Sequence, residues 1–216
     1  MLGVALSGKF ITFEGVEGAG KSTQIRLLAE HLRQSGHGVT VTREPGGTPT
    51  AEAIRDVILS GAAKGLGPDS EAVLFAAARA DHVDEVIRPA LERGDWVLCD
   101  RFIDSTRVYQ GAADGVDPVL IRALERIAID GTRPDLTLVL DVPVDLGMER
   151  VTSREEESDR FESDEIGRHE ARRLAYLEIA SREPERVVVI DAKRTPEEIA
   201  DTIRRVVGAR LLDRAA

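Results

Sequence analysis

The segment from Gly15 to Ser22 reads GVEGAGKS and fits the phosphate-loop pattern G-x-x-x-x-G-K-[ST]. An apolar, strand-like stretch precedes it and a helical pattern follows it, which is the context that this loop requires. Its glycines let backbone N–H groups turn toward phosphate oxygens, and the helix N-terminus adds partial positive charge. We expect Lys21 to reach the β- and γ-phosphates and the Ser22 hydroxyl to coordinate Mg²⁺.

The loop predicts a site for ATP or GTP. The residues that we assign to it are Gly15, Val16, Glu17, Gly18, Ala19, Gly20, Lys21, Ser22 and Thr23. Phosphate loops occur in switches, motors and small-molecule kinases, so the loop alone leaves the reaction open. The chain contains no asparagine, which excludes the Asn-Lys-x-Asp motif by which GTPase switches read guanine. Its 216 residues favour a small-molecule kinase over a motor, which would carry additional modules.

The 29 basic and 39 acidic residues give a net charge of −10. This balance argues against binding to duplex nucleic acid, which needs basic surface, but not against binding small anions at a local site. No apolar run approaches the length of about 20 residues that spans a membrane, and no secretory signal is recognisable. The lone cysteine, Cys99, permits no internal disulfide, so we expect a cytoplasmic protein. The four histidines are scattered and predict no metal site.

Hydrophobic patterning predicts strands that alternate with helices. The strands are expected at 9–14, 39–42, 96–99, 136–140 and 187–190. Among the helices, one is expected over 53–59 and another from about residue 70, with Asp69 as its N-cap. Because several strands are apolar on both faces, the predicted fold class is α/β, a five-stranded parallel sheet flanked by helices. No linker divides the chain, so we expect one domain over 1–216, with Trp96 and Cys99 in its core.

Further motifs follow one another along the chain. They are FEGVEGAGKST at 13–23, TREPGGT at 42–48, LFAAAR at 74–79, DRF at 100–102 with Ser105, Tyr109 and Gln110, and RPDLT at 133–137. In this order and spacing the sequence closely resembles the bacterial thymidylate kinases over nearly its whole length. The resemblance implies a nucleoside monophosphate kinase fold with a mobile lid. It also implies transfer of the ATP γ-phosphate to dTMP, giving dTDP and ADP, with Mg²⁺ as cofactor and with a homodimer as the usual assembly.

Phe75 and Arg79 lie four positions apart on an expected helix and so share one face. A ring and a guanidinium on one face suit a pyrimidine, by stacking and by hydrogen bonding to a carbonyl. From spacing alone, a core phenylalanine and a surface arginine would fit the pattern as well. The resemblance implies that Phe75 stacks on thymine and that Arg79 donates to the base.

Asp100 and Arg101 follow the strand 96–99, at the edge where open α/β sheets bind ligands. The resemblance implies that Arg101 binds the acceptor phosphate and that Asp100 lies near the metal, although a strand-end cap is an alternative role for Asp100. Glu17 stands inside the phosphate loop, where a carboxylate repels triphosphate. The resemblance implies a contact with the acceptor's 3′-hydroxyl, although a side chain that points into solvent is the alternative. The family usually has Tyr or His at Phe102, so we assign this position no polar contact.

The remaining substrate-site candidates are Arg43, Arg55, Ser105, Tyr109 and Gln110. The two arginines are expected to steer the acceptor phosphate. The Gln110 amide can match one edge of thymine, and Tyr109 is expected to pack on the deoxyribose, where it would crowd a 2′-hydroxyl. The resemblance also suggests a cis peptide at Glu44–Pro45.

Residues of about 150–163 mix many charges with few apolar anchors. A solvated loop is one interpretation, and a lid that closes on ATP and excludes water is the other. The resemblance favours a lid, because Gly18 stands where the eukaryotic-type enzymes have an arginine, and the bacterial type uses a lid arginine instead. We expect Arg154, and as second choice Arg160, to join Lys21 and Arg101 as catalytic residues, and Arg150 to pack near adenine.

Two rival functions stay open at this point. One is a kinase for another nucleoside monophosphate, which a panel of dTMP, dUMP, dCMP and AMP would distinguish. The other is a non-catalytic nucleotide-binding module, which ATP turnover dependent on an acceptor would exclude.

Overall fold

The computed structural model describes residues 8–152 and 165–212. Within them one parallel sheet has the strand order β2-β3-β1-β4-β5. The strands are β1 (Lys9–Glu14), β2 (Val39–Arg43), β3 (Trp96–Asp100), β4 (Leu136–Asp141) and β5 (Val187–Asp191). The five-stranded parallel sheet predicted from the sequence is therefore confirmed. The register pairs both Phe13 of β1 and Arg43 of β2 with Asp100, so the three strands end together at one edge.

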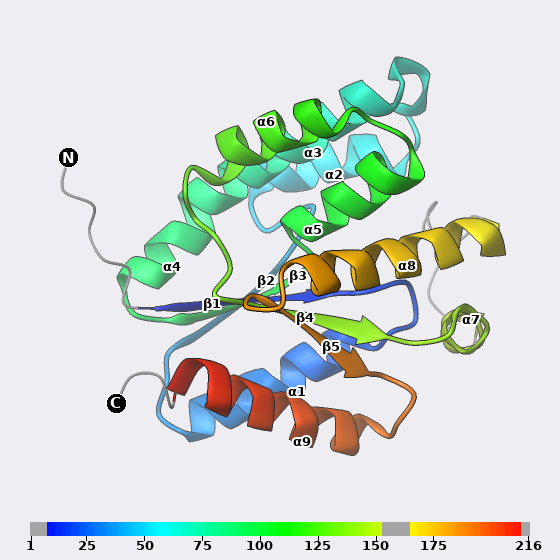
Figure 1. The fold of residues 1–216 in the computed structure, drawn as a ribbon. Coiled ribbons are helices and arrows are strands. Elements are labelled where there is room, and N and C mark those ends of the chain that lie inside the picture. Colours follow the sequence, from blue (N-terminus) through cyan, green and yellow to red (C-terminus); the bar gives the residue numbers. More distant parts are fainter. Residues whose placement is uncertain (1–7, 153–164, 213–216) are drawn as a thin grey trace.

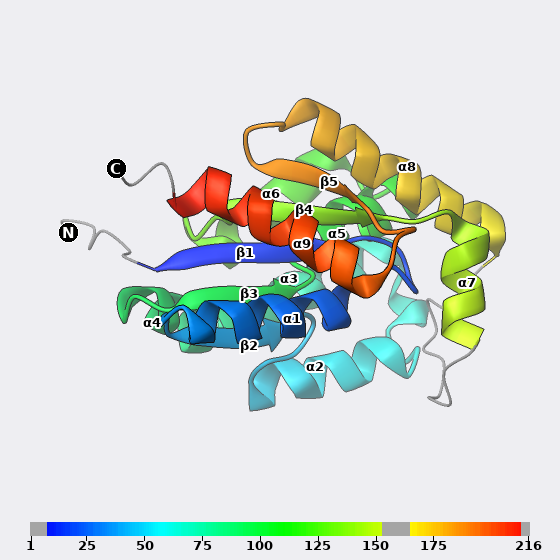
Figure 2. The same cartoon turned by 90° about the horizontal axis from the view of Figure 1, so that it is seen from below.

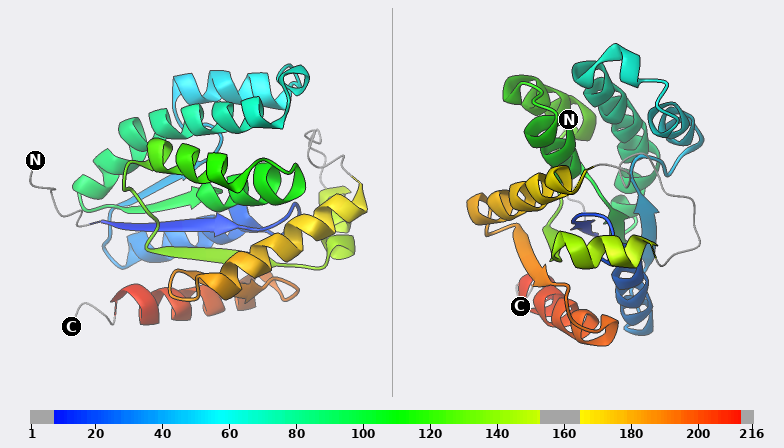
Figure 3. Two further views of the ribbon diagram at one scale, coloured as in Figure 1. Left: turned by 45° about the horizontal axis from the view of Figure 1, so that its top comes forward. Right: turned by 90° about the vertical axis from the view of Figure 1, so that its right-hand side faces the viewer.

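Helices cover both faces of this sheet, as Figures 1 and 2 show. One face carries α1 (Lys21–Gln34) and α9 (Pro196–Val207), which pack against each other. The other face carries α3 (Pro68–His82), α4 (Arg88–Glu92), α5 (Ile103–Thr106), α6 (Pro118–Ile129) and α8 (Ile166–Arg182), with α2 (Pro49–Leu59) packed on α3. Short 3₁₀ or π-helical segments complete the chain: η1 (Lys64–Leu66), η2 (Val83–Ile87), η3 (Arg107–Ala113) and η4 (Gly208–Leu212). The remaining helix, α7 (Val144–Thr152), lies beyond the carboxyl ends of the central strands, in front of the sheet in the right-hand view of Figure 3.

Strand β1 shows how an apolar strand supplies two cores. Ile11 and Phe13 pack with residues of α1 and α9, whereas Phe10 packs with residues of η2, α4 and β3. Successive side chains of a strand point to opposite faces, so a strand covered on both sides is apolar throughout. Trp96 and Cys99 are buried in these cores, as predicted.

Two helices begin differently from the sequence prediction. Helix α2 starts at Pro49 instead of residue 53, because the Thr48 side chain accepts a hydrogen bond from the Ala51 N–H at 3.0 Å and so caps the helix. Helix α3 starts one residue before Asp69, which therefore lies in the first turn and does not cap it. The Asp69 charge still favours this end of the helix dipole. None of the helices in the described residues combines the length and apolar character needed to cross a membrane.

Candidate functional site

A cleft of about 350 Å³ opens at the edge where β1, β2 and β3 end. The phosphate loop, the segments after β2 and β3, and residues of α2, α3, α5 and η3 line it. The sequence-predicted residues among its lining are Glu17, Gly18, Ala19, Gly20, Lys21, Ser22, Arg43, Arg55, Phe75, Arg79, Asp100, Arg101, Ser105, Tyr109 and Gln110. The fold thus gathers the predicted phosphate-binding and acceptor-binding residues in a single cleft.

The Lys21 side chain contacts the backbone of its own phosphate loop. The Lys21 ammonium donates to the carbonyl oxygens of Gly15 at 3.1 Å and Val16 at 3.3 Å. Gly20, with a left-handed φ of 88°, leads directly into α1, so the loop ends at a helix N-terminus. Burial lowers the pKa of Lys21 and so does the charge of Arg101, while nearby carboxylates oppose them. A lysine and backbone donors in this arrangement can bind the phosphates of a nucleotide.

Ser22 and Asp100 form a pair of oxygen donors beside the lysine. The Ser22 hydroxyl donates to Oδ2 of Asp100 at 3.1 Å, because the register of β1 and β3 places Asp100 next to the loop. The other carboxylate oxygen, Oδ1, is buried and has no hydrogen-bond partner among the described residues. A hydroxyl and a carboxylate are ligands that Mg²⁺ prefers together with phosphate oxygens, so these residues fit such an ion.

No cluster of three or more His, Cys, Asp or Glu side chains that could hold a metal occurs in the part of the chain that the structure describes. A magnesium ion held by Ser22 and Asp100 would depend on phosphate and water for its other ligands, as is usual for this ion.

Arg101 follows β3 in a left-handed conformation, with a φ of 67° that is uncommon outside glycine. Its guanidinium donates to Glu17 Oε1 at 3.1 Å and, from Nη1, to the hydroxyl oxygens of Ser105 at 3.3 Å and Tyr176 at 3.4 Å. It also lies over the Tyr109 ring, 5.0 Å from the centroid. A guanidinium held from several sides in this way can bind a phosphate with its remaining donors.

Glu17 is buried and its carboxylate is held from three elements. Oε1 accepts hydrogen bonds from Arg101 and, at 2.5 Å, from the Tyr109 hydroxyl. Oε2 lies 3.1 Å from His169 Nδ1, which donates because an ionised carboxylate can only accept. Burial alone would raise the pKa of Glu17, but the hydrogen bond from His169 and the charges of Arg101 and Lys21 lower it well below its usual range. Glu17 therefore stays ionised inside the phosphate loop.

Arg79 is buried at the side of the cleft and is held at three of its nitrogens. Nε donates to Glu44 Oε2 at 2.7 Å, Nη1 to the Thr106 hydroxyl at 3.0 Å and Nη2 to the Phe102 carbonyl oxygen at 3.0 Å. His82 Nδ1 lies 3.0 Å from the other oxygen of Glu44. The buried guanidinium is thus fixed in orientation and is not the solvated surface charge that spacing alone would also have fitted.

The other acceptor-side candidates have partners as well. Arg43 Nη2 lies 3.2 Å from both carboxylate oxygens of Glu52, and Arg55 donates to the Pro45 carbonyl oxygen at 2.8 Å. The peptide bond between Glu44 and Pro45 is cis, as the resemblance suggested. Gln110 is buried and donates to Glu71 at 3.3 Å.

Several predicted residues lie outside the cleft lining. Gly15, Val16 and Thr23 belong to the loop or to α1 but do not line the cleft. Arg150 of α7 donates to the Ala192 carbonyl oxygen at 3.0 Å. The two lid arginines, Arg154 and Arg160, lie outside the described residues.

Gly18 and Gly147 bring the phosphate loop and α7 into backbone contact. A Cβ atom on Gly18 would overlap the backbone of Gly147, and one on Gly147 would lie 2.8 Å from the carbonyl oxygen of Glu17. No side chain, arginine included, has room at position 18 while α7 stays where it is.

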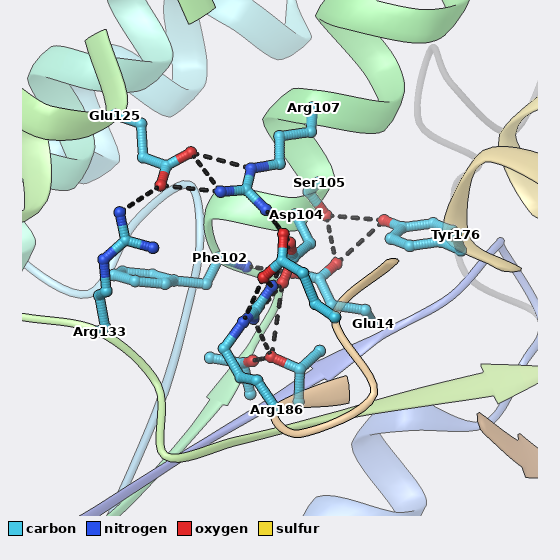
Figure 4. A network of polar contacts seen from close by, with 12 residues as sticks. Glu14, Phe102, Asp104, Ser105, Arg107, Glu125, Arg133, Tyr176 and Arg186 are labelled. Atoms are coloured by element: carbon cyan, nitrogen blue, oxygen red, sulfur yellow. Dashed lines mark hydrogen bonds and ion pairs between the residues drawn. The ribbon is translucent and has the colours of Figure 1, made fainter. Parts of the chain in front are cut away.

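Sequence reasoning missed a set of buried or half-buried polar residues in and behind the cleft. They are Glu14, Glu44, His82, Asp104, His169, Arg172, Tyr176 and Arg186. Figure 4 shows part of this set, in which Asp104 accepts from both Arg186 and Arg107. Glu14 and Glu44 carried a signal, because they lie inside the FEGVEGAGKST and TREPGGT motifs. The others come from elements whose packing the sequence pattern does not reveal.

Comparisons with known proteins found similar chains. A family model described as thymidylate kinase matches residues 13–203. Thymidylate kinases from two strains of Rhodopseudomonas palustris are 55% and 54% identical over 214 residues, covering 98% of this chain and 93% of each relative. The crystal structure of thymidylate kinase from Ehrlichia chaffeensis superposes with a TM-score of 0.76 at 35% identity, covering 93% of this chain and 98% of the other.

Proposed function

Because this chain belongs to the thymidylate kinase family and phosphorylates dTMP, we propose that the cleft at the end of β1, β2 and β3 is where the reaction takes place. The observation that carries this proposal is the meeting of two anion sites. Lys21 and the loop form one, and Arg101 forms the other, with Phe75 and Arg79 on the side of the acceptor base. The sequence-based alternatives of another acceptor and of a non-catalytic module are disfavoured by the 55% identity to a thymidylate kinase.

The chemistry that this cleft supports is direct in-line transfer between two phosphate groups. An oxygen of the dTMP phosphate attacks the γ-phosphorus of ATP, and ADP leaves. The attacking oxygen is already ionised near neutral pH, so the residues mainly have to orient two anions and balance their charge. Lys21 and the loop N–H groups bind the ATP phosphates, and Arg101 holds the acceptor phosphate in line.

Mg²⁺ bound with ATP is the proposed cofactor, and its chemistry there would be to neutralise phosphate charge. Ser22 and Asp100 would hold it, since their oxygens lie together beside the loop and Asp100 Oδ1 is otherwise unsatisfied among the described residues.

On the acceptor side we propose that Phe75 stacks on thymine while Arg79 and Gln110 read its polar edge. Tyr109 packs on the deoxyribose and Glu17 contacts the 3′-hydroxyl, for which its Oε1 and Oε2 are already oriented by three partners. Arg43 and Arg55 steer the incoming phosphate from the rim, where Arg43 contacts Glu52 and Arg55 donates to the Pro45 carbonyl oxygen.

We further propose that residues of about 150–163 act as a lid in the single domain and that Arg154, or Arg160, contacts the transferring phosphoryl group. Arg150 would mark the start of this lid, near the adenine end of ATP. The closed contact between Gly18 and Gly147 supports a lid arginine, because the loop has no room for one of its own.

A homodimer and a cytoplasmic location complete the proposal. Val73 of α3 and Val119 and Ile127 of α6 are exposed apolar side chains on two helices that pack together, and a second copy could cover them. The lone cysteine is a buried free thiol, which fits a reducing compartment.

Purified Lys21→Ala and Arg101→Ala variants test the assignment of the cleft. We expect both to lose measurable dTDP formation in a coupled ATP assay, because each removes the main cation of one anion site. Arg26→Ala is the matched control, since Arg26 is an exposed basic residue of α1 that pairs with Glu30. The same assay with dTMP, dUMP, dCMP and AMP should give the highest kcat/KM for dTMP. Near-normal turnover by either site variant would refute the assignment.

A further inference from the structure

The carboxyl group of Glu14 is buried behind the cleft. Glu14 is the last residue of β1 and is fully buried, and it does not line the cleft. Its Oε1 accepts the backbone N–H of Phe102 at 2.8 Å. Its Oε2 accepts the hydroxyls of Ser105 at 2.7 Å and Tyr176 at 2.9 Å, and Figure 4 shows the carboxyl group beside both.

The two hydroxyl groups connect Glu14 to Arg101. The same Ser105 and Tyr176 oxygens accept from Arg101 Nη1, at 3.3 Å and 3.4 Å. A hydroxyl has a single proton, so a hydroxyl that donates to Glu14 turns its lone pairs toward the guanidinium. Because a guanidinium can only donate, the carboxylate sets the hydrogen-bond polarity that Arg101 requires.

Glu14 also acts on the backbone that carries Arg101. Arg101 adopts a left-handed φ, which persists in a non-glycine residue only where surrounding contacts maintain it. The very next N–H group, that of Phe102, is the one that Glu14 Oε1 binds. One carboxylate therefore restrains both the turn and the guanidinium of Arg101.

We propose that Glu14 is a positioning residue for the acceptor phosphate: it holds Arg101 in its binding orientation through Phe102 N–H, Ser105 and Tyr176. This inference rests on the proposed role of Arg101. Glu14 itself touches neither substrate, so its contribution passes through the arginine.

Glu14→Gln tests this with almost no change of shape. If the amide oxygen of the glutamine faces the two hydroxyl groups, its NH₂ group faces the Phe102 N–H, and two donors then oppose each other. If the NH₂ group faces the hydroxyl groups instead, it donates to them, and their protons turn toward Arg101. Either orientation loses a contact that positions the guanidinium. We expect kcat/KM for dTMP to fall about tenfold to a hundredfold, while KM for ATP stays within about twofold of the wild type. Burial raises the pKa of Glu14 to about 7, so assays at pH 8 compare the amide with the ionised carboxylate.

Thr12→Val is the matched control. Thr12 lies two residues before Glu14 on the same strand and is equally buried. The substitution removes one hydrogen bond, of 2.7 Å to Thr137, and this bond does not involve Arg101. Its dTMP kinetics should be those of the wild type even if its stability falls. A Glu14→Gln enzyme that folds and behaves like Thr12→Val would overturn the inference.

Calorimetric dTMP affinity in a double-mutant cycle separates positioning from a general structural effect. Glu14→Gln should weaken dTMP binding in the wild type but not in the Arg101→Ala background. Additive losses would contradict action through Arg101. If Arg101→Ala alone left dTMP binding and turnover intact, that result would refute the proposed role of Arg101, whatever the effect of Glu14→Gln.

Tyr176→Phe keeps the test decisive if Glu14→Gln does not fold. It removes one hydroxyl between the carboxylate and the guanidinium and leaves the ring in place. We expect a smaller loss of dTMP affinity, on the order of a few-fold, that also disappears in the Arg101→Ala background. A Tyr176→Phe effect on ATP affinity instead of dTMP affinity would refute the positioning role.

Discussion

A carboxylate inside a phosphate loop opposes ATP binding unless other groups neutralise it, and Glu17 shows how single residues do so. Its carboxylate accepts hydrogen bonds from Arg101, Tyr109 and His169, and Arg101 carries the opposite charge. The sequence indicated that Glu17 was not incidental, and it identified Arg101 and Tyr109 as site residues. It did not indicate that the three touch. His169 was missed because it lies 152 positions from Glu17, and a lone histidine carries no sign of such a contact.

Glu17 also affects the stability of the protein in acid. The pKa of Glu17 is lowered in the folded protein, so its ionisation contributes stability above the ordinary value of 4.5, and this contribution is lost as the pH falls below it. His169→Leu removes one of the groups that lower this pKa. The midpoint of acid unfolding should move to higher pH, and stability at pH 7 should fall by about 1–3 kcal/mol.

Fluorescence of the single, buried Trp96 can follow this acid unfolding. His31→Leu serves as the control, because His31 is an exposed histidine of α1. Equal acid midpoints for the two variants would show that His169 does not stabilise the Glu17 carboxylate.

Among elements, the sequence predicts best what is local. Apolar strands and the context of the phosphate loop were readable, and the parallel sheet followed from the strands. The start of α2 was missed because its Thr48–Pro49 cap precedes the apolar pattern. The set of contacts around Glu44 and His82 was missed because it joins the segment after β2 to α3 across 38 positions. Such contacts depend on how elements pack, which residue spacing does not encode.

The contact of the phosphate loop with α7 leads to a prediction for Gly18. Gly18→Ala should destabilise the protein and weaken ATP binding, because the new methyl group would overlap the backbone of Gly147. Gly36→Ala is the matched control: Gly36 also has a positive φ, of 87°, but a Cβ there meets nothing within 4 Å. Both variants share a conformational cost of about 1–2 kcal/mol.

Chemical unfolding and ATP titration of the two alanine variants measure the difference. Only Gly18→Ala should show a further loss of stability together with weaker nucleotide binding. The contact would be unimportant if the two variants matched in both measurements.

For the molecule as a whole, a net charge of −10 has to coexist with two bound anions. The cleft achieves this locally, with Lys21, Arg101 and Arg79 lining it and with the loop carboxylate already paired. Composition alone predicted the exclusion of duplex binding. It could not predict where the cations gather, because that depends on the register that brings the ends of β1, β2 and β3 together.

The exposed apolar side chains of α3 and α6 lead to a prediction about dimer formation. Sedimentation analysis should show a dimer for the wild type and a shift toward monomer for Ile127→Glu, because Ile127 of α6 is 69% exposed and a charge there opposes apolar burial. Leu174→Glu is the control, since Leu174 is 56% exposed on a different helix, α8. A monomeric wild type, or equal shifts by both variants, would refute a dimer through α3 and α6.

The contact between Gly18 and Gly147 also limits how such a protein can evolve. An arginine cannot enter the loop by one substitution, because α7 blocks the position until its backbone has moved. A large residue at position 147 is equally closed while the loop keeps its path. A lineage that gains an arginine in the phosphate loop must therefore also move α7, and an intermediate with only one of the two changes would be selected against. The contact between the two glycines thus restricts which segment can supply the arginine during evolution.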